Sequence, residues 1–572
     1  MNWVVKGQTW PEERVALSPL TARLLSARGI SPEEVEAFLH PSLEQLHSPF
    51  LLHQMDRAVE RILEAVKREE SILVYGDYDV DGVSSTALLV RGLERLGAKV
   101  TAYIPDRFEE GYGLHRSGVD HAREVGATLI VTVDCGVTAM EEVAYARQLG
   151  IDVVITDHHL PKETLPDAVA VVNPRVGETY PFPELAGVGV TFKLLEALHA
   201  RTGASRKPLL WDLDLVVLGT VGDVVPLMGE NRVLVHYGLK VLAHTRKAGL
   251  KALKEVAKVR GSKLHPWHVS FILAPRLNAA GRLTHARHAL ELLTTRDGKR
   301  ALQIAEQLHA ENQRRQQLER KILEEAIQMI EAGDLEKSWV LVVAREGWHE
   351  GVVGIVASRL VERYERPALV IALQNGEGKG SGRSVESFHL FRALLEAEEL
   401  LESFGGHRMA AGVRIRSDRL EALRDRLNAY ARANHEPEDL LPEVHLDLVL
   451  EDPAWLHDPR LPEEMEQLEP FGSGHPHPAL LIPDVRVLQI ARPSRRRVSV
   501  IGSWRGLQLV LDARARGRRW ERELQAGQRV DVAVKMKSAQ FPPYRFDLLD
   551  VRPRSGLQGL ASSRGEQNVV EN

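Results

Sequence analysis

The chain has 572 residues, a hydrophobic fraction of 44%, a charged fraction of 27% and a net charge of −5. This length predicts three or four domains, and the composition is that of a soluble globular protein, expected in the cytoplasm without a signal peptide or membrane contact. The single cysteine, Cys135, excludes an internal disulfide and a cysteine-based zinc site, so a metal would have to be held by Asp, Glu or His.

Strand and helix patterns alternate through the first part of the chain. Residues 1–50 predict a small N-terminal extension packed on the next domain, and residues 51–230 predict an α/β domain with a parallel sheet and right-handed crossovers. The expected strands are 72–76, 99–104, 128–133 and 152–156, and the expected helices are 56–70, one from about 84, 117–125, 140–149 and 190–200.

The second part of the chain changes character twice. Residues 231–335 predict a helical connector that ends in a long helix from about 296 to 332, and residues 336–436 predict a second α/β lobe. Five short β-type segments within 437–553 favour a small barrel of the OB-fold kind, and residues 554–572 are expected to be disordered. The predicted fold is therefore two α/β lobes joined by a long helix and followed by a β-barrel.

Three carboxylates, those of Asp77, Asp79 and Asp81, follow the strand at 72–76 at intervals of two residues. Alternate side chains of an extended segment share a face, so these groups would converge and repel one another unless a cation neutralises them. The competing interpretation is a solvated acidic turn closed by Gly82.

Two further strands end in the same residue types. Asp134 follows the strand at 128–133, and Asp157-His158-His159 follows the strand at 152–156. A fourth apolar run, 213–220, is interpreted as another strand end and precedes Asp223, for which a turn residue is the competing interpretation. Ligands collect at the carboxyl ends of parallel strands, so these clusters predict one site.

Carboxylates with one or two imidazoles suit Mn²⁺ or Mg²⁺, and the ligands suffice for two ions about 3.5–4 Å apart. Such a pair hydrolyses phosphodiesters by lowering the pKa of a bound water and by neutralising the phosphate oxygens, without a protein nucleophile. We expect Asp157 to hold an imidazole and His159 to orient a neighbour or contact phosphate. The phosphate-binding loop of nucleotide-driven motors is absent from the sequence.

Seven motifs together resemble the DHH phosphoesterase superfamily. They are GDYDVDG at 76–82, DCG at 134–136, DHH at 157–159, GTVGDVVPL at 219–227, APRLNAAGRL at 274–283, GSGRS at 380–384 and GGHRMAAG at 405–412. The resemblance implies a DHH catalytic domain at 51–230 and a DHH-associated domain at 336–436.

The resemblance also implies metal-dependent 5′-to-3′ degradation of single-stranded DNA to mononucleotides, in recombination and repair. By position, the implied metal ligands are Asp79, Asp81, Asp134, His158 and Asp223, which with His159 make the catalytic set. Asp77 is a sixth candidate ligand at a place where many relatives carry histidine. The implied partners are single-stranded DNA and, by function, a helicase and a single-strand-binding protein, and we expect a monomer.

Candidate substrate contacts lie in two regions. In the second lobe, Ser381, Arg383, Gly405, Gly406 and His407 combine small residues and cations in a way that favours phosphate binding, although two glycine turns would look alike. Before the long helix, Arg276, Asn278 and Arg282 could bind phosphates at the 5′ end, although loop arginines are commonly only solvated.

Basic residues gather in the barrel segment. Residues 486–552 hold sixteen Lys or Arg against six Asp or Glu, interspersed with aromatics, which is typical of a surface that follows a single strand. Arg496, Arg518 and Trp520 represent this patch. The alternative is a barrel with solvated arginines and core aromatics.

Three other functions compete. A DHH hydrolase of short oligonucleotides or cyclic dinucleotides would lack the basic barrel, and an inactive replication scaffold would have lost ligands. A pyrophosphatase would need a much shorter chain.

Overall fold

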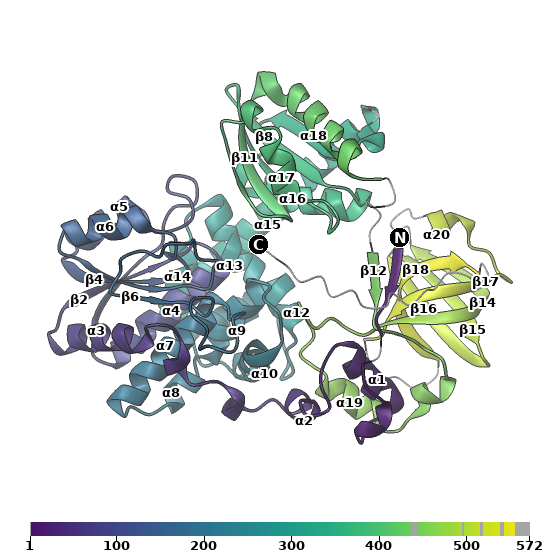
Figure 1. Cartoon of the computed structure of the whole chain (residues 1–572), viewed down its shortest axis with the longest axis horizontal. Coiled ribbons are helices and arrows are strands. Elements are labelled where there is room, and N and C mark those ends of the chain that lie inside the picture. The colour runs from purple at the N-terminus through teal and green to yellow at the C-terminus, as the bar shows by residue number, and fades with distance from the viewer. Residues whose placement is uncertain are drawn as a thin grey trace.

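Two α/β lobes and a β-barrel are separate bodies in the computed structural model (Figure 1). The structure describes residues 2–554 except 8, 334, 437–438, 440–442, 495–496, 515–518 and 538–542. The expected disordered tail therefore lies outside the described residues, apart from Arg554. The predicted architecture of two α/β lobes followed by a barrel is confirmed.

The first lobe is built on a five-stranded parallel sheet in the order β3-β2-β4-β5-β6. Alternate side chains of its strands enter two different cores: Ile72 and Val74 pack with one helix layer, while Leu73 and Tyr75 pack with the other. The strands β2, β4 and β5 are neighbours, so their carboxyl ends meet at one edge. The bounds are β2 Ser71–Gly76, β3 Lys99–Tyr103, β4 Ala127–Val133, β5 Asp152–Thr156 and β6 Ala170–Val172.

Helices cover both faces of this sheet. The helices α5 and α6 contribute to one core, and α3, α4, α7 and α9 contribute to the other. Their bounds are α3 Met55–Lys67, α4 Val80–Arg95, α5 Arg116–Glu124, α6 Met140–Gln148, α7 Gly187–Thr202 and α9 Leu213–Gly222. The predicted strand–helix alternation of this lobe is confirmed.

The segment at 213–220 is a helix, and its interpretation as a fourth strand end was wrong. Residues Leu213–Val221 of α9 are all buried, so the sequence carries no helical alternation of apolar and polar positions. A short, uniformly apolar run fits a buried strand and a buried helix equally well. Asp223 therefore follows the end of a helix, with its N–H bonded to the carbonyl of Gly219 at 2.8 Å.

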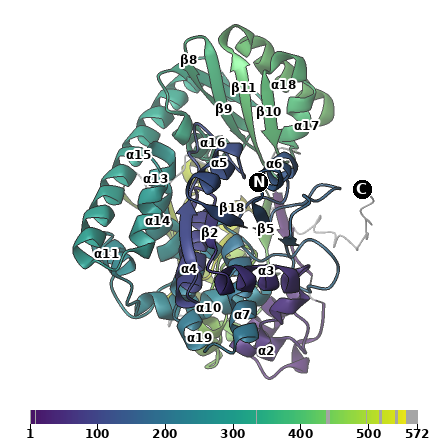
Figure 2. The ribbon, with the colours of Figure 1, turned by 90° about the vertical axis from the view of Figure 1, so that its left-hand side faces the viewer.

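A run of helices leads to the long connector α15, Gly298–Ala332, whose prediction is confirmed. Asp297 begins α15 by accepting hydrogen bonds from the N–H groups of Lys299 and Arg300. Its 35 residues correspond to about 52 Å, and Figure 2 shows it running from the first lobe to the second. No described helix is long and apolar enough to cross a bilayer. The preceding elements are α10 Gly229–Ala243, α11 Ala248–Val256, α12 Pro266–His268, the π-helical segment η4 Val269–Leu273, α13 Ala274–Leu283 and α14 Arg287–Thr294.

The second lobe contains a mixed sheet in the order β10-β11-β9-β8-β7. The strands β7 and β8 are parallel and joined through α16, while the other pairs are antiparallel. Their bounds are β7 Leu341–Glu346, β8 Ala368–Gln374, β9 Glu377–Arg383, β10 Ser403–Gly406 and β11 Ala410–Arg416, with α16 Glu350–Tyr364, α17 Leu390–Leu395 and α18 Leu420–Asn434.

The barrel closes because its first strand pairs on both sides. The order is β14-β15-β16-β18-β17, with β17 returning to β14. The parallel pair β16–β18 and the helix α20 Arg519–Glu523 between β16 and β17 give the connectivity of an OB-fold-like barrel. The bounds are β14 Ala479–Ser494, β15 Arg497–Trp504, β16 Leu507–Arg514, β17 Arg529–Lys535 and β18 Tyr544–Pro553.

The N-terminal residues contact the far end of the chain. The strand β1, Asn2–Val5, pairs in parallel with β12, Glu443–Leu446, and α1, Pro19–Ala27, shares the barrel's hydrophobic core (Figure 1). The later part, from about Phe38 to Phe50, packs on the first lobe. The expectation that residues 1–50 pack on the next domain is thus wrong for their first part, because their apolar partners lie some 440 residues away in sequence.

Candidate metal centre and interlobe cleft

The acidic loop after β2 begins the site. Asp79 caps α4: its Oδ1 accepts the N–H groups of Asp81 at 2.8 Å and of Gly82 at 3.1 Å. The N–H of Val80 donates to Oδ1 of Asn278 at 2.8 Å, which ties the loop to α13. One oxygen of Asp79 thus fixes the loop, and its other oxygen is left for a ligand.

Asp81 lies at the bottom of the site and is fully buried. Its two carboxylate oxygens accept the N–H groups of Gly187 at 2.7 Å and of Val188 at 2.9 Å, at the start of α7. A Cβ on Gly219 would lie 2.4 Å from Oδ1 of Asp81, and one on Gly187 would lie 2.5 Å from Oδ1 of Asp134. Glycine at these two positions lets helices approach the carboxylates closely.

Asp134 and His158 face each other from the ends of β4 and β5. Nε2 of His158 lies 3.1 Å from Oδ1 of Asp134, 3.7 Å from Oδ2 of Asp223 and 4.0 Å from Oδ2 of Asp81. Within the described part of the chain, Nε2 of His158 and Oδ1 of both Asp77 and Asp134 are buried without a hydrogen-bond partner. Unpaired buried polar atoms that point at one space indicate a missing ligand.

The other two residues of the DHH motif build the turn. Asp157 accepts the N–H groups of Val137, His158 and His159, and its Oδ1 lies 2.7 Å from Nδ1 of His159. Asp157 therefore holds His159 rather than His158. Burial alone would raise the pKa of Asp157, but these bonds outweigh it and lower the pKa. Burial opposes the charge of His159, but the bond to Asp157 prevails and raises the pKa of His159 to about 9, so His159 is positive.

The electrostatics of the cluster disfavour several carboxylate charges close together, and a bound cation would relieve this repulsion. Burial and mutual repulsion raise the pKa of Asp77, Asp81 and Asp134, and raise that of Asp223 to about 7. Burial lowers the pKa of His158 to about 4, so its imidazole is neutral and able to bind a metal. The clusters of ligand atoms within 4.8 Å of one another are Asp77/Asp79/Asp134, Asp81/His158/Asp223 and Asp134/His158/His159. This donor set fits hard divalent cations, and Asp134 belongs to two of the three clusters.

Arginines line the side of the cluster that faces the second lobe. Burial and the cations of Arg107, Arg315 and Arg383 lower the pKa of Arg282 to about 10, and burial and Arg107 lower that of Arg383. Among the described residues, Arg107, Arg282 and Arg383 make no ion pair with a carboxylate. Half-buried guanidinium groups without a direct ion-pair partner, beside a metal centre, form a site for an anion such as phosphate.

The other predicted contacts fall into two groups. Arg383 donates to Oγ of Ser381 at 2.9 Å, and both belong to β9, which shares the sheet with the glycines of β10. Gly406 and His407 lie exposed at the end of β10. Arg276 instead turns to α15, where its Nε donates to Nδ1 of His309 at 3.2 Å. The structure thus places Arg282 and Arg383 near Arg107, with Ser381 against Arg383, while Arg276 contacts α15.

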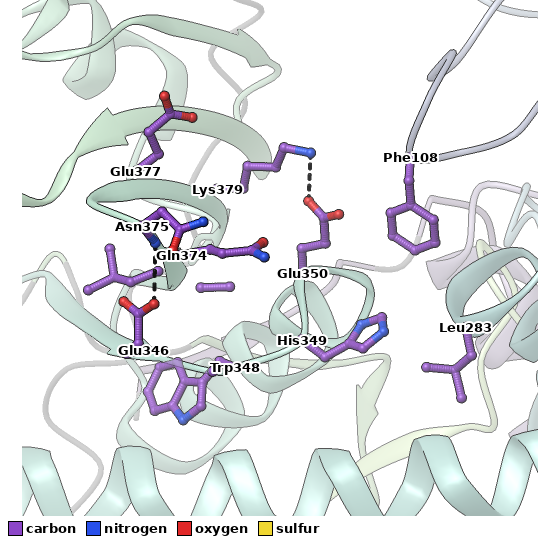
Figure 3. Close-up of a pocket in the computed structure, with 13 residues that line it drawn as sticks. Phe108, Leu283, Glu346, Trp348, His349, Glu350, Gln374, Asn375, Glu377 and Lys379 are labelled. Carbon is purple, nitrogen blue, oxygen red and sulfur yellow. Dashed lines mark hydrogen bonds and ion pairs between the residues drawn. The ribbon is translucent and has the colours of Figure 1, made fainter.

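Two adjoining cavities mark the cleft between the lobes. The smaller, about 530 Å³, is lined by Arg107 from the first lobe and by Ser381, Gly405 and Arg414 from the second. The larger, about 930 Å³, lies at the carboxyl ends of β7 and β8, where Lys379 and Glu350 pair at 2.8 Å (Figure 3). The larger cavity has one lysine against three glutamates, whereas the smaller has three cations against three glutamates, so the smaller is better suited to a phosphate backbone.

The basic barrel patch is only partly described. Arg496 and Arg518 lie outside the described residues. Trp520 is half-buried and packs against the barrel core, while Trp504 and Tyr544 are buried within it. Stacking on a base is thus excluded for Trp504, which is 0% exposed.

Two functional candidates were missed in the sequence. Arg107 follows β3 just as the acidic loop follows β2, and this position after a strand end is the sequence signal that points to it. The hydroxyl of Tyr112 lies 2.8 Å from Nδ1 of His159, and no sequence signal indicated this contact.

Comparison with known proteins agrees with this geometry. The model described as "DHH family, N-terminal domain" matches residues 71–220, and "DHHA1 domain" matches residues 337–433. The single-stranded-DNA-specific exonuclease RecJ of Bacillus subtilis is 42% identical over 476 residues, which are 82% of this chain and 59% of that protein. This chain thus spans less than two thirds of the Bacillus relative. RecJ of Salmonella typhimurium is 39% identical over 452 residues, 75% of this chain and 78% of that protein.

Two solved structures extend the similarity. RecJ of Thermus thermophilus in complex with Mn²⁺ superimposes with a TM-score of 0.82 at 33% identity, covering 98% of this chain and 80% of that one. A second structure of exonuclease RecJ bound to manganese gives a TM-score of 0.61 at 39% identity, covering 69% of this chain and 97% of that one.

Proposed function

We propose that this chain, which belongs to the RecJ family of single-stranded-DNA-specific exonucleases, releases mononucleotides from single-stranded DNA in the 5′-to-3′ direction. The observation that carries the proposal is the set of buried ligand atoms that have no hydrogen-bond partner among the described residues, beside arginines that form no ion pair there. The proposed domains are those expected from the sequence, at 51–230, 231–335, 336–436 and 437–553.

The proposed metal ligands are those expected from the sequence, including Asp77. Mn²⁺ or Mg²⁺, as a pair, would activate water and neutralise the phosphate oxygens. The ligands are Asp77, Asp79, Asp81, Asp134, His158 and Asp223. In support, two structures of RecJ from Thermus thermophilus are described as complexes with Mn²⁺ and with Mg²⁺.

Side chains of the protein would bind the metal, contact the phosphates and hold the acidic loop in place. His158, neutral because burial lowers its pKa, presents a lone pair at Nε2. His159, kept positive by Asp157, places a cation at the rim where it can contact a phosphate oxygen. Arg107, Arg282 and Arg383 bind the phosphate next to the scissile one, which orients the backbone and sets polarity. Asn278 holds the acidic loop through Val80.

The barrel would guide the strand towards this cleft, with Arg496, Arg518 and Trp520 among its contacts. A cytoplasmic role in recombination and repair, as a monomer that works with a helicase and a single-strand-binding protein, completes the proposal.

Digestion assays test the proposed exonuclease activity. Single-stranded DNA, duplex DNA, RNA and dinucleotides are incubated with Mn²⁺, with Mg²⁺ or with EDTA. We expect mononucleotides from single-stranded DNA with either metal and none with EDTA, and a 5′ label released before a 3′ label. Equal initial loss of both labels would contradict the polarity, and preferred cleavage of dinucleotides would favour a short-oligonucleotide hydrolase.

A further inference from the structure

The loop that carries Asp223 is strained. Val224, the next residue, has a φ of 66°, a left-handed conformation that β-branched residues rarely adopt. Such a conformation persists only where the surroundings impose it. Neighbouring parts of the chain must therefore hold residues 223–227 in place.

The loop at 223–227 is contacted by the segment that precedes the barrel, residues 467–477, here called the junction segment. The N–H of Leu227 donates to the carbonyl of Ser473 at 2.8 Å. Two glycines of the segment touch the same loop: a Cβ on Gly474 would lie 2.7 Å from Cβ of Pro226, and one on Gly472 would lie 2.5 Å from Cδ1 of Leu227. From the first lobe, Asn231 adds a bond to the carbonyl of Pro226 at 3.1 Å.

The junction segment is itself fixed to the first lobe by one buried side chain. The guanidinium of Arg232, on α10, donates to the carbonyls of Phe38, Gln467, Leu468, Glu469 and Pro470. These bonds use all five N–H donors of an arginine. At its other end, His475 accepts a bond from Arg28 at 2.9 Å, and Arg28 pairs with Asp447 beside β14. The segment is thus clamped at both ends, and its middle lies against the Asp223 loop.

We propose that the junction segment is a positioning element for Asp223, which holds the strained loop so that this carboxylate completes the metal centre. The inference rests on the proposed function for its metal, but not on the nature of the DNA substrate. It makes the metal affinity of the first lobe depend on a segment some 250 residues later, at the base of the barrel.

The test uses two glycines in nearly the same backbone conformation. Gly474 has a φ of 66° and Gly203, the residue after α7, has a φ of 70°, but a Cβ on Gly203 would meet nothing within 4 Å. G474A and G203A in the full chain therefore impose the same left-handed strain, and only G474A pushes on Pro226. Mn²⁺ binding is measured without DNA, by calorimetry and by the Mn²⁺-induced rise in the unfolding temperature.

We expect G474A to bind Mn²⁺ about tenfold more weakly than the wild type, the range seen when groups that orient metal ligands are lost, and G203A to bind as the wild type does. With Mn²⁺ limiting, G474A should lower kcat while leaving KM for single-stranded DNA unchanged. If G474A does not unfold cooperatively, G472A, which presses on the movable tip of Leu227, should show a smaller loss in the same direction.

Equal Mn²⁺ affinity in the wild type and in folded G474A or G472A would overturn the proposal, as would an equal loss in G203A. If the wild type binds Mn²⁺ and G474A weakens that binding, but the wild type does not degrade single-stranded DNA, the proposed function is refuted and this inference stands.

Discussion

Nε2 of His158 and Oδ1 of Asp134 lie 3.1 Å apart, yet neither atom has a hydrogen-bond partner among the described residues. Nε2 of His158 also lies within 4.0 Å of carboxylate oxygens of Asp81 and Asp223, so these atoms surround one common space. Burying these polar atoms removes their hydrogen bonds to water, and no protein group replaces those bonds. Without a metal, the cluster therefore destabilises the folded state.

Asp134→Asn tests whether the cluster destabilises the fold in the absence of metal. The amide removes a buried carboxylate whose pKa is raised by burial and by its acidic neighbours, so the protein in EDTA should become more stable. A gain of about 1 kcal/mol corresponds to roughly 2–4 °C in Tm. Nucleotide release should fall more than about 100-fold, because a proposed metal ligand is lost. Calorimetry in EDTA and in Mn²⁺ and a nuclease assay measure both effects, with the exposed Asp425→Asn as control; a lower Tm in EDTA would contradict the argument.

Arg107→Ala tests the anion site. Loss of one charge-assisted contact of about 1.5–3 kcal/mol should raise KM for single-stranded DNA by roughly 10–100-fold. The effect should be larger for strands with a 5′ phosphate than for strands with a 5′ hydroxyl. Arg123→Ala, an exposed arginine of α5, is the matched control. If Arg107→Ala and Arg123→Ala behaved alike, Arg107 would be only a solvated cation.

Arg232→Lys tests the clamp on the junction segment. An ammonium group has three donors for the five carbonyls that Arg232 now satisfies, so at least two buried carbonyls lose their partner. We expect the free energy of unfolding to fall by about 2–3 kcal/mol, measured by urea titration. A loss below about 0.5 kcal/mol would mean that water replaces the missing donors.

His475→Gln tests a pH dependence of stability. His475 is buried, accepts a bond from Arg28 and donates to the carbonyl of Leu468, and its pKa is lowered to about 2 by burial and by Arg28 and Arg232. Between about pH 6.5, the ordinary value, and pH 2, the unfolded chain therefore binds one proton more than the folded chain. The contribution of His475 is fully present above pH 6.5 and is lost as the pH falls.

The free energy of unfolding of the wild type should fall by up to about 1.4 kcal/mol for each pH unit in this range, owing to His475. Glutamine can keep both hydrogen bonds without titrating, so H475Q should lose less stability than the wild type between about pH 7 and pH 5 in urea titrations. Parallel pH profiles of the two proteins would show that His475 does not contribute.

Much of the first lobe follows from local pattern. Strands of buried apolar residues that end in Asp or His, as at Val133–Asp134 and Thr156–Asp157, could be predicted directly because side chains and strand ends obey short-range rules. The long helix α15 followed from its composition and from the absence of proline. By contrast, the uniformly apolar α9 carried no period, so its helical state could not be told from a strand.

The residue types of the metal centre and the order of the domains can be predicted from the amino-acid sequence, because most of the carboxylates and histidines directly follow predicted strands. Asp223, which follows a helix, is the exception. Three contacts are visible only in the folded chain: Asp157 holds His159, Arg107 lies near Arg282 and Arg383, and residues 467–477 lie against the loop of Asp223. Several of these contacts join residues more than a hundred positions apart. They depend on how helices and loops pack, which is set by the complementary shape of the whole chain and not by local periodicity.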